Sequence, residues 1–464
     1  MKSITIGSGV FVFLYAILCE GCTLNLTQDN ELTDPKAVYD VSSAYELLSS
    51  AYDELPDAQL QLSLLASDFE PLPMASNDKE LRNLYYWQSK EIRELAQSLW
   101  EGYYRAISSI NLIEERSTLL GEKNAAYHYL MGEVYTLKAY VYLELLSLFS
   151  PAYVEGGGAP AVVLKSLSHA ETLPRSTQSE VLTTVFTLLD RADEHFESAS
   201  DFVPEHKGNY YVSSETARAV RVRTLLFQGD YSRALEVCSE LLTRRPQATW
   251  RTDLVFWVNT PHDALFVQSR RTRIYTEFYH DHAAWRSNKF AVATALTFDK
   301  GDKRLGTYVL SNEGRVSYAP ETTQLMGKYN YANMERQEPL MGYRIRWSEM
   351  EYIRAEALAR LGREDEARRV LAACRQLLGL DNSFLSDLRT EELLHTILTD
   401  KRKEFIGEGI NFLDAKRLRA TQRRAGGDIK GDDYRYTFPI PKSEYAANPA
   451  IKEQNPGWPA IGIK

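Results

Sequence analysis

The stretch that decides the fold stands near the C-terminus and reads Phe438-Pro439-Ile440-Pro441, then Asn448-Pro449, then Gln454-Asn455-Pro456-Gly457-Trp458. A proline lacks a backbone N–H, and the residue before it favours extended conformations. Residues 430–464 are therefore expected to form neither a helix nor an inner strand, and packing against the rest of the protein must fix their course. We call this segment the C-terminal belt and expect it to be structural.

A charged segment precedes the belt, and its charges alternate with apolar residues such as Phe405 and Phe412. As a helix it would place carboxylates and guanidinium groups at the edge of a buried face. Two interpretations follow: a binding site, or an ion-pair network that pins the belt to the helices. We favour the network. A segment without the regular backbone hydrogen bonds of a helix or sheet must pair its backbone N–H and C=O groups with side chains. The motif residues are Arg402, Glu404, Glu408, Gly409, Asp414 and Arg417, joined by Asn455, Pro456 and Gly457 in the belt.

The N-terminus has the pattern of an export signal. An apolar run from Val10 to Leu18 is shorter than the roughly 20 residues of a membrane-spanning helix, and Gly21-Cys22 follows it. We predict a lipoprotein signal peptide at residues 1–21 and acylation of the Cys22 thiol, with palmitate as an attached acyl chain.

Two alternatives to this processing stay open. Cys19 could be the acylated residue, although the bulky Leu18 before it disfavours cleavage there, and an ordinary secretory signal could be cut near Ala16. Residues 22–40 are largely polar and acidic, which suits a tether that leaves a membrane.

Length, charge and cysteine content limit the class of protein. The 464 residues can bury a large core, and no linker rich in Ser, Gly or Pro divides them, so residues 22–464 are expected to form one domain. The net charge of −9, without a long Lys/Arg cluster, argues against nucleic acid as a partner. Cys238 and Cys374 occupy apolar positions of helical patterns, so disulfides are not expected to build the fold.

Helical periodicity dominates the middle of the chain. Apolar residues recur at steps of three and four along 125–149 and 95–115, which predicts an antiparallel pair of helices. Two later helix pairs turn at Gly229 and Gly362, where glycine supplies the left-handed conformation that ends a helix. These pairs look like tetratricopeptide units, but they stand about a hundred residues apart instead of in tandem at roughly 34. The sequence predicts a mainly α scaffold with insertions, not a free solenoid.

The two insertions lie near residues 66–90 and 250–335 and lack a sustained helical period, so short strands and long loops are expected. Loops on a rigid frame often carry binding residues. Aromatic rings in such loops favour sugar binding, because pyranose C–H groups stack on flat rings. The candidate ligand-binding residues are Tyr85, Tyr86, Trp87, Tyr279 and Trp285; the alternative is that these rings belong to the core.

Motifs for other chemistry are weak. His280-Asp281-His282 supplies two imidazoles where a zinc site needs three or four ligands, so no metal is expected. Gly156-Gly157-Gly158 lacks the Gly-Lys-Ser/Thr of a phosphate-binding loop and predicts a bend. No Gly-x-Ser-x-Gly elbow occurs, and adjacent acids such as Glu114-Glu115 are usually solvated. We expect neither catalytic residues nor a cofactor.

In order and spacing, the motif of Arg402–Arg417 and the belt resembles the C-terminal signature of the SusD/RagB family, the nutrient-binding outer-membrane lipoproteins of Bacteroidetes. The family has similar residues at three further positions of this chain: Leu173-Pro174-Arg175, Gly132-Glu133 and Gly229-Asp230-Tyr231. One departure is Asn411, where the family usually has an arginine, and it is expected to loosen the electrostatic match.

The resemblance implies a mainly α SusD-like fold and a lipoprotein that is anchored in the outer membrane and faces the cell exterior. It further implies capture of an oligosaccharide, and delivery to a SusC-like TonB-dependent transporter over which the protein acts as a lid. Peptide capture by the same architecture is the nearest alternative. A tetratricopeptide-type adaptor is a more distant one, and it would favour tandem repeats without an export signal.

Overall fold

The computed structural model describes residues 38–204, 208–245, 263–268, 289–314, 316–328 and 342–460. Residues Val38–Lys464 form one compact unit. Cys22 and the signal peptide lie outside the described residues, as do His280-Asp281-His282, Tyr279 and Trp285. What the sequence predicts for them stays a prediction.

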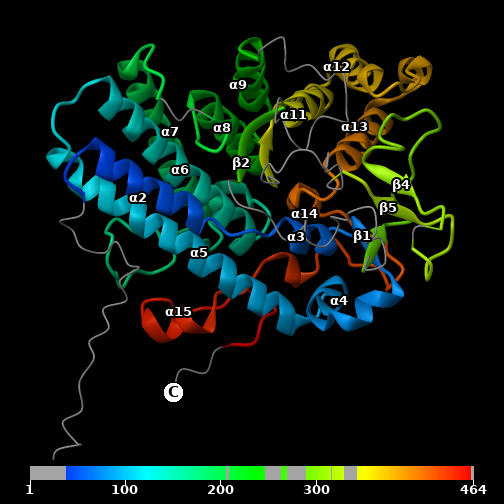
Figure 1. The fold of residues 1–464 in the computed structure, drawn as a ribbon, viewed down its shortest axis with the longest axis horizontal. Coiled ribbons are helices and arrows are strands. Elements are labelled where there is room, and N and C mark those ends of the chain that lie inside the picture. The colour runs from blue at the N-terminus through cyan, green and yellow to red at the C-terminus, as the bar shows by residue number, and fades with distance from the viewer. Residues whose placement is uncertain are drawn as a thin grey trace, which may run out of the picture. The chain divides into compact units, whose positions relative to one another are not determined.

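The fold is mostly helical, as predicted (Figure 1). The helices are α2 (Val41–Glu54), α3 (Gln59–Leu65), α4 (Lys79–Tyr85), α5 (Ser89–Arg116), α6 (Ala125–Phe149), α7 (Gln178–Ala199), α8 (Ser214–Gln228), α9 (Tyr231–Thr243), α11 (Trp347–Arg360), α12 (Glu364–Leu377), α13 (Thr390–Glu404), α14 (Ile410–Arg417) and α15 (Lys442–Ala447). The strands are β1 (Phe69–Pro71), β2 (Ala264–Gln268), β3 (Phe290–Val292), β4 (Val309–Ser311), β5 (Gln324–Met326) and β6 (Gly342–Arg346). They form antiparallel pairs β1–β3, β2–β6 and β4–β5.

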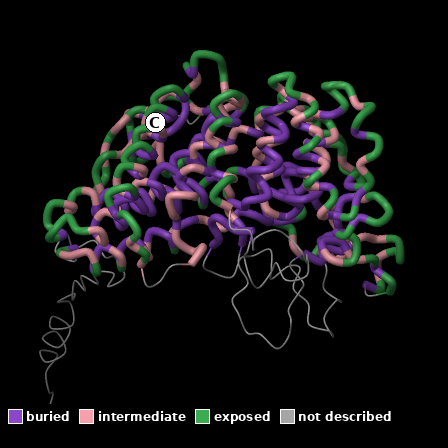
Figure 2. Tube along the Cα trace, turned by 90° about the horizontal axis from the view of Figure 1, so that it is seen from above, coloured by how far each residue is buried: buried purple, intermediate pink, exposed green. Residues whose placement is uncertain are grey.

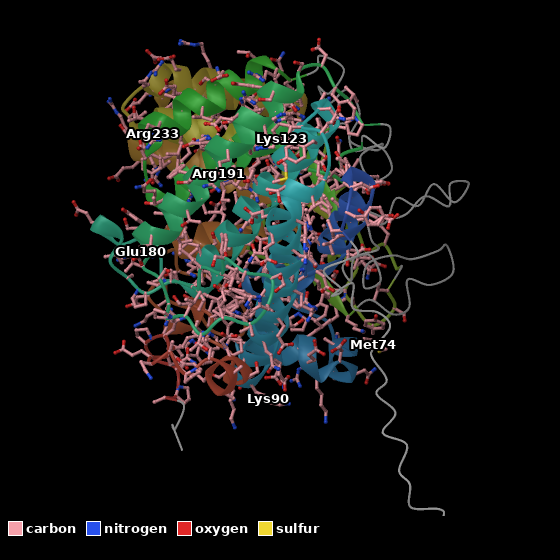
Figure 3. All side chains as sticks on the ribbon, turned by 90° about the vertical axis from the view of Figure 1, so that its left-hand side faces the viewer. Met74, Lys90, Lys123, Glu180, Arg191 and Arg233 are labelled. Carbon is pink, nitrogen blue, oxygen red and sulfur yellow. The ribbon has the colours of Figure 1, made fainter. Side chains whose placement is uncertain are left out.

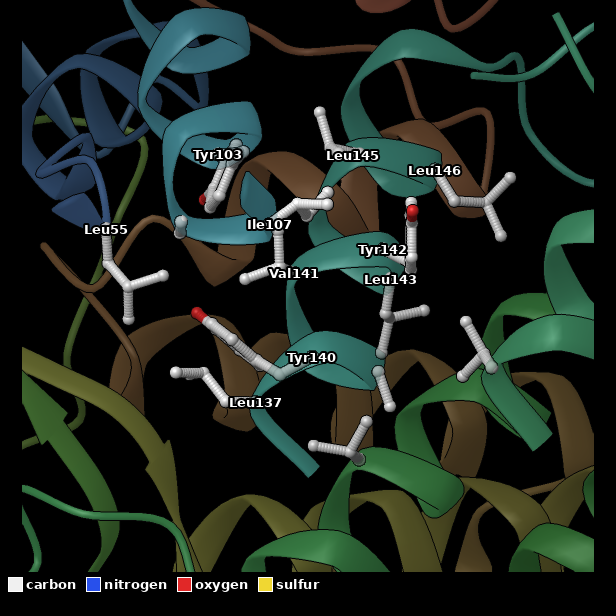
Figure 4. Packing of buried hydrophobic residues seen from close by; sticks show 14 of the residues in the cluster. Leu55, Tyr103, Ile107, Leu137, Tyr140, Val141, Tyr142, Leu143, Leu145 and Leu146 are labelled. Carbon is white, nitrogen blue, oxygen red and sulfur yellow. The ribbon is translucent and has the colours of Figure 1, made fainter. Parts of the chain in front are cut away.

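Helix α6 is the core of the scaffold and matches the predicted range of 125–149. It begins where the side chain of Asn124 accepts a hydrogen bond from the Tyr127 N–H, as an N-cap does. It packs against α5, which runs in the opposite direction, and against α7 (Figure 1). Ile107 of α5 and Val141 of α6 belong to the same buried cluster (Figure 4). The predicted antiparallel pair is therefore present.

The two predicted helix pairs, α8–α9 and α11–α12, also form. Gly229 ends α8 in the left-handed conformation, and Gly362, at φ 72°, turns the chain between α11 and α12. Helix α9 packs directly on α11, so the pairs meet in space although residues 244–346 separate them in sequence. Fully buried alanines such as Ala234 and Ala355 allow this close approach.

The bend predicted at the glycine run is confirmed. Gly156 and Gly157 have φ of 79° and 65°, and a Cβ on Gly157 would lie 2.9 Å from the backbone N of Ser179. The chain thus bends after α6 through backbone conformations that only glycine adopts without strain.

The C-terminal belt is held by side-chain amides. Asn455 Nδ2 donates to the carbonyls of Phe149 (2.8 Å) and Phe438 (2.6 Å), and Gln454 bonds both the N–H and the carbonyl of Ile440. Phe438, Ile440 and Trp458 are buried. These contacts support the structural interpretation of the belt. The expectation that the belt holds no helix is wrong for α15, which fits between Pro441 and Asn448 because a helix start needs no N–H from the proline before it.

The buried stretches of the trace run through the interior, and exposed turns lie at its border (Figure 2). In the described part of the chain, no helix is both long enough and apolar enough to cross a membrane.

Candidate functional site

Of the three candidate sugar-binding rings that the structure describes, Trp87 and Tyr85 are buried. Trp87 is 0% exposed, its indole N–H donates to the Leu65 carbonyl at 3.2 Å, and its ring lies edge-on to Tyr436 at 4.8 Å. Tyr85 is also buried, with the Arg424 guanidinium 3.9 Å from the centre of its ring. A ligand-binding role for these two rings is not supported, because Trp87 packs on Phe412 and Tyr436, and Tyr85 lies in the buried cluster that includes Phe69 and Phe290.

Tyr86 is the exception among the described aromatic candidates. It is 37% exposed, with one edge against Tyr85 and the guanidinium of Arg82 5.6 Å from its ring centre. The breakers in 66–90 suggested a loop, but Leu81, Leu84 and Tyr85 stand at helical spacing and are the buried face of α4. That spacing was the signal that could have placed Tyr85 in the core.

Two motif residues, Glu404 at the end of α13 and Glu408 in the turn before α14, meet strand β6 in a buried ionic cluster, which we call the ionic hub: Asp263, Lys328, Arg346, Glu404 and Glu408. Arg346 donates to Asp263 at 3.1 Å, to Glu404 at 2.9 Å and to Glu408 at 2.6 Å. Lys328 donates to Glu408 and, at 2.9 Å, to the Glu404 carbonyl. Burial lowers the pKa of Lys328 to about 8, with Glu408 opposing the shift.

Local structure explains why Arg346 stands at the centre of the hub. It is the last residue of β6 and the residue before α11, so its backbone is fixed by both elements. Asp263 precedes β2, the partner strand, and its carboxylate accepts from the Ser348 N–H at 3.1 Å in the first turn of α11. A carboxylate at a helix N-terminus is stabilised by the unpaired N–H groups there.

The end of α13, the turn after it and the start of α14 are all fastened to α3 and the residues that follow it. Arg402 donates to the carbonyls of Ala66 (3.1 Å) and Ser67 (3.0 Å). Gly409, at φ 79°, donates its N–H to Ser63 Oγ at 3.1 Å. Asn411 donates to Asp68 Oδ1 at 2.9 Å. Asn411, which stands where the family usually has an arginine, thus has a buried hydrogen-bond partner.

A second group of ion pairs joins α14 to α11 and α13. Arg417 forms a two-pronged pair with Glu356 at 2.8 and 2.9 Å and also binds Asp414 at 2.8 Å. Lys401 lies 2.6 Å from Asp414. Burial opposes ionisation of Asp414, but Lys401 and Arg417 overcome it and lower its pKa to about 2.

The network is structural, but it does not pin the belt as expected. The hydrogen-bond and ion-pair partners given above for its motif charges lie on α11, α13, α14 and β6, at Lys328, and in the residues that follow α3. The belt packs instead on the ring of Phe412, whose centre is 5.6 Å from those of Tyr436 and Phe438. Apolar contact and the amide of Asn455 replace the predicted ion pairs.

A small cavity of about 60 Å³ lies where α6, α8 and α14 meet, and Lys416 lines it. Lys416 Nζ donates to the carbonyls of Ser147 (2.6 Å) and Leu148 (3.1 Å) near the end of α6. Burial lowers the pKa of Lys416 to about 7. A cation beside the last carbonyls of a helix is favourable, so the lysine serves as a cap.

A larger groove of about 640 Å³ runs between the first turns of α5 and the C-terminal belt. We call it the belt groove. Its lining residues are Lys90, Arg93, Glu94, Gln97, Pro439, Ile440, Pro441, Lys442, Gln454, Trp458, Pro459 and Ala460. The volume is within the roughly 300–1,000 Å³ that ligand sites occupy. Across the described ranges, no cluster of three or more His, Cys, Asp or Glu side chains could hold a metal ion.

Comparison with known families decides the relationship. The model described as SusD family matches residues 262–458, and the model described as starch-binding associating with outer membrane matches residues 24–222. The chain belongs to the SusD/RagB family. No curated protein matches the chain.

Solved structures of SusD proteins share the fold. A SusD superfamily protein from Bacteroides thetaiotaomicron matches with TM-score 0.74 and 20% identity over 90% of this chain and 100% of its own. A putative sugar-binding protein from Bacteroides vulgatus matches with TM-score 0.73 and 18% identity, covering 91% and 99%. A SusD-like carbohydrate-binding protein from the same species matches with TM-score 0.72 and 18% identity, covering 89% and 98%.

Proposed function

We propose that this SusD/RagB protein is a non-catalytic lipoprotein of the outer membrane that captures an oligosaccharide and delivers it to a partner TonB-dependent transporter. The observation that carries the proposal is the match of residues 24–222 to the family of starch-binding proteins that associate with the outer membrane. Anchoring through Cys22 and a position on the cell exterior are part of the same proposal.

The distribution of polar groups supports binding without catalysis. The buried acids of the ionic hub and of α14 are engaged by arginine and lysine, as the contacts of Glu404, Glu408 and Asp414 illustrate. Acids held in this way do not face each other across an open substrate site, as glycoside hydrolysis requires. The belt groove, in contrast, combines exposed polar side chains of α5 with an exposed apolar edge at Pro459 and Ala460, which is a mixture suited to a sugar.

Binding is tested with the chain that begins at Thr23, which retains every described residue. An array of bacterial, plant and host glycans is screened, and hits are measured by calorimetry together with a pool of short peptides. The proposal expects micromolar to millimolar glycan binding and no change in the glycan after long incubation. Binding of peptides alone, or cleavage of the glycan, would overturn it.

Anchoring and delivery have separate tests. Cys22→Ala is expected to release the protein from the membrane fraction, whereas Cys19→Ala is expected to leave it attached. Gentle detergent extraction of the lipidated protein should co-purify a TonB-dependent transporter. Retention of the Cys22→Ala protein with release of the Cys19→Ala protein would move the lipid to Cys19, and extraction without any transporter would count against delivery.

A further inference from the structure

The wall of the belt groove is a polar face of α5. Lys90, Arg93, Glu94 and Gln97 follow one another at steps of three, one and three, so they share one side of the helix. All four are exposed, and Lys90 stands at the border of the molecule in Figure 3. Their side chains are therefore available to a ligand without unfolding any part of the scaffold.

The floor of the groove is apolar and rigid. Pro439, Pro441 and Trp458 form its buried base, and Pro459 and Ala460 are exposed at its edge. The Trp458 indole N–H donates to the Thr437 carbonyl at 2.8 Å, and its ring lies 5.2 Å from that of Tyr434, so the tryptophan holds the edge in place. Because the amide of Asn455 also fixes the belt, the exposed edge is held in place before any ligand arrives, which reduces the entropy that binding costs.

The charge of the groove differs in sign from that of the chain. Three cations, Lys90, Arg93 and Lys442, line it against one acid, Glu94, whereas the whole chain carries −9. Lys90 pairs with Glu94 at 3.5 Å, and both are largely exposed. Arg93 and Lys442 form no hydrogen bond or ion pair with any residue that the structure describes. Two unpaired cations beside a rigid apolar floor are arranged for an anionic ligand.

We infer that the belt groove binds an acidic oligosaccharide, with a sugar carboxylate on Arg93, support from Lys442, and the sugar against the exposed apolar edge at Pro459. The inference rests on the proposed function and narrows its substrate class. A guanidinium presents two parallel N–H donors that match the two oxygens of a carboxylate. Gln97 adds a neutral partner for hydroxyl groups, since its amide nitrogen donates to Glu101 and its oxygen stays available as an acceptor.

The test compares tetragalacturonate, its methyl ester and maltotetraose by calorimetry on the chain that begins at Thr23. We expect tetragalacturonate to bind, the methyl ester and maltotetraose to bind at least tenfold more weakly, and the difference to shrink as salt screens the charges. Arg93→Gln, which removes the charge from an exposed side chain, should weaken tetragalacturonate binding about tenfold.

The matched control is Arg369→Gln on α12, an exposed arginine at the other side of the molecule from α15 (Figure 1). It changes the net charge equally and should leave binding unchanged. Equal affinity for the acid and its methyl ester would overturn the acidic preference while glycan capture stands. Equal effects of the two substitutions, or no binding of tetragalacturonate, would remove the belt groove as an acidic-sugar site. Failure of every glycan on the array would instead count against the proposed function.

Discussion

The ionic hub and the belt groove are both rich in charge, but the charges are placed in opposite ways. In the hub, Arg346 is 1% exposed and contacts three carboxylates. In the groove, Arg93 is exposed and contacts no described residue through a hydrogen bond or ion pair. Taking charges out of water is costly unless they are paired, so Arg346 of the hub is engaged by its carboxylates and buried away from any ligand. In this chain the buried, paired charges hold elements of the fold together, whereas the exposed, unpaired charges are those that we propose for binding.

Breaking the hub should have the largest effect. Arg346→Met keeps much of the side-chain volume but leaves Asp263, Glu404 and Glu408 buried without their shared cation. Removing one partner of a buried pair costs about 3 to 5 kcal/mol, so a large fall in the free energy of unfolding is expected. Urea unfolding followed by circular dichroism measures it. A variant within 1 kcal/mol or so of the parent would show that the hub contributes little.

Trp87→Ala should also destabilise the protein strongly. The ring is fully buried and touches Tyr436 of the belt, so its removal leaves a cavity that costs about 3 to 5 kcal/mol. Tyr86→Ala is the matched control, because Tyr86 is 37% exposed, and it should cost far less. Thermal unfolding of both variants checks the expectation. A Trp87→Ala protein that melts like the parent but loses glycan binding would restore the sugar-platform interpretation.

Lys416 provides a pH-dependent comparison of moderate size. Its pKa is lowered from 10.5 to about 7 by burial, so the folded chain releases this proton near pH 7 while the unfolded chain keeps it until about pH 10.5. Between these values the unfolded state holds more protons, and stability must rise with pH by up to roughly 1.4 kcal/mol per unit.

Lys416→Met removes this titrating group, so the free energy of unfolding of the variant should not show that rise with pH. From pH 7 to pH 10, the free energy of unfolding of the parent is expected to rise relative to that of Lys416→Met. The control is Lys442→Met, which replaces an exposed lysine and should show the same pH dependence as the parent. Curves for the parent and Lys416→Met that run parallel over this range would show that Lys416 stays charged in the folded protein.

Sequence patterns predicted the scaffold better than the site, for physical reasons. Helix α6 could be placed because its apolar residues recur at helical steps and the core surrounds it. The partners of the hub could not be named, since Arg346 and Lys328 precede Glu408 by 62 and 80 positions and are brought there by strand pairing. The belt groove was missed because its walls, at Lys90–Gln97 and Pro439–Ala460, meet only through the packing of the belt.

We propose that the fold leaves Arg93 and Lys442 of the belt groove free for an acidic ligand. Thermal unfolding of the parent and of Arg93→Gln, each with and without tetragalacturonate, tests it most directly, because a ligand that binds only the folded state raises the melting temperature. We predict equal melting temperatures without ligand, and a ligand-induced rise in the parent that is largely lost in Arg93→Gln. An equal rise in both proteins, or a lower melting temperature of Arg93→Gln without ligand, would contradict the claim.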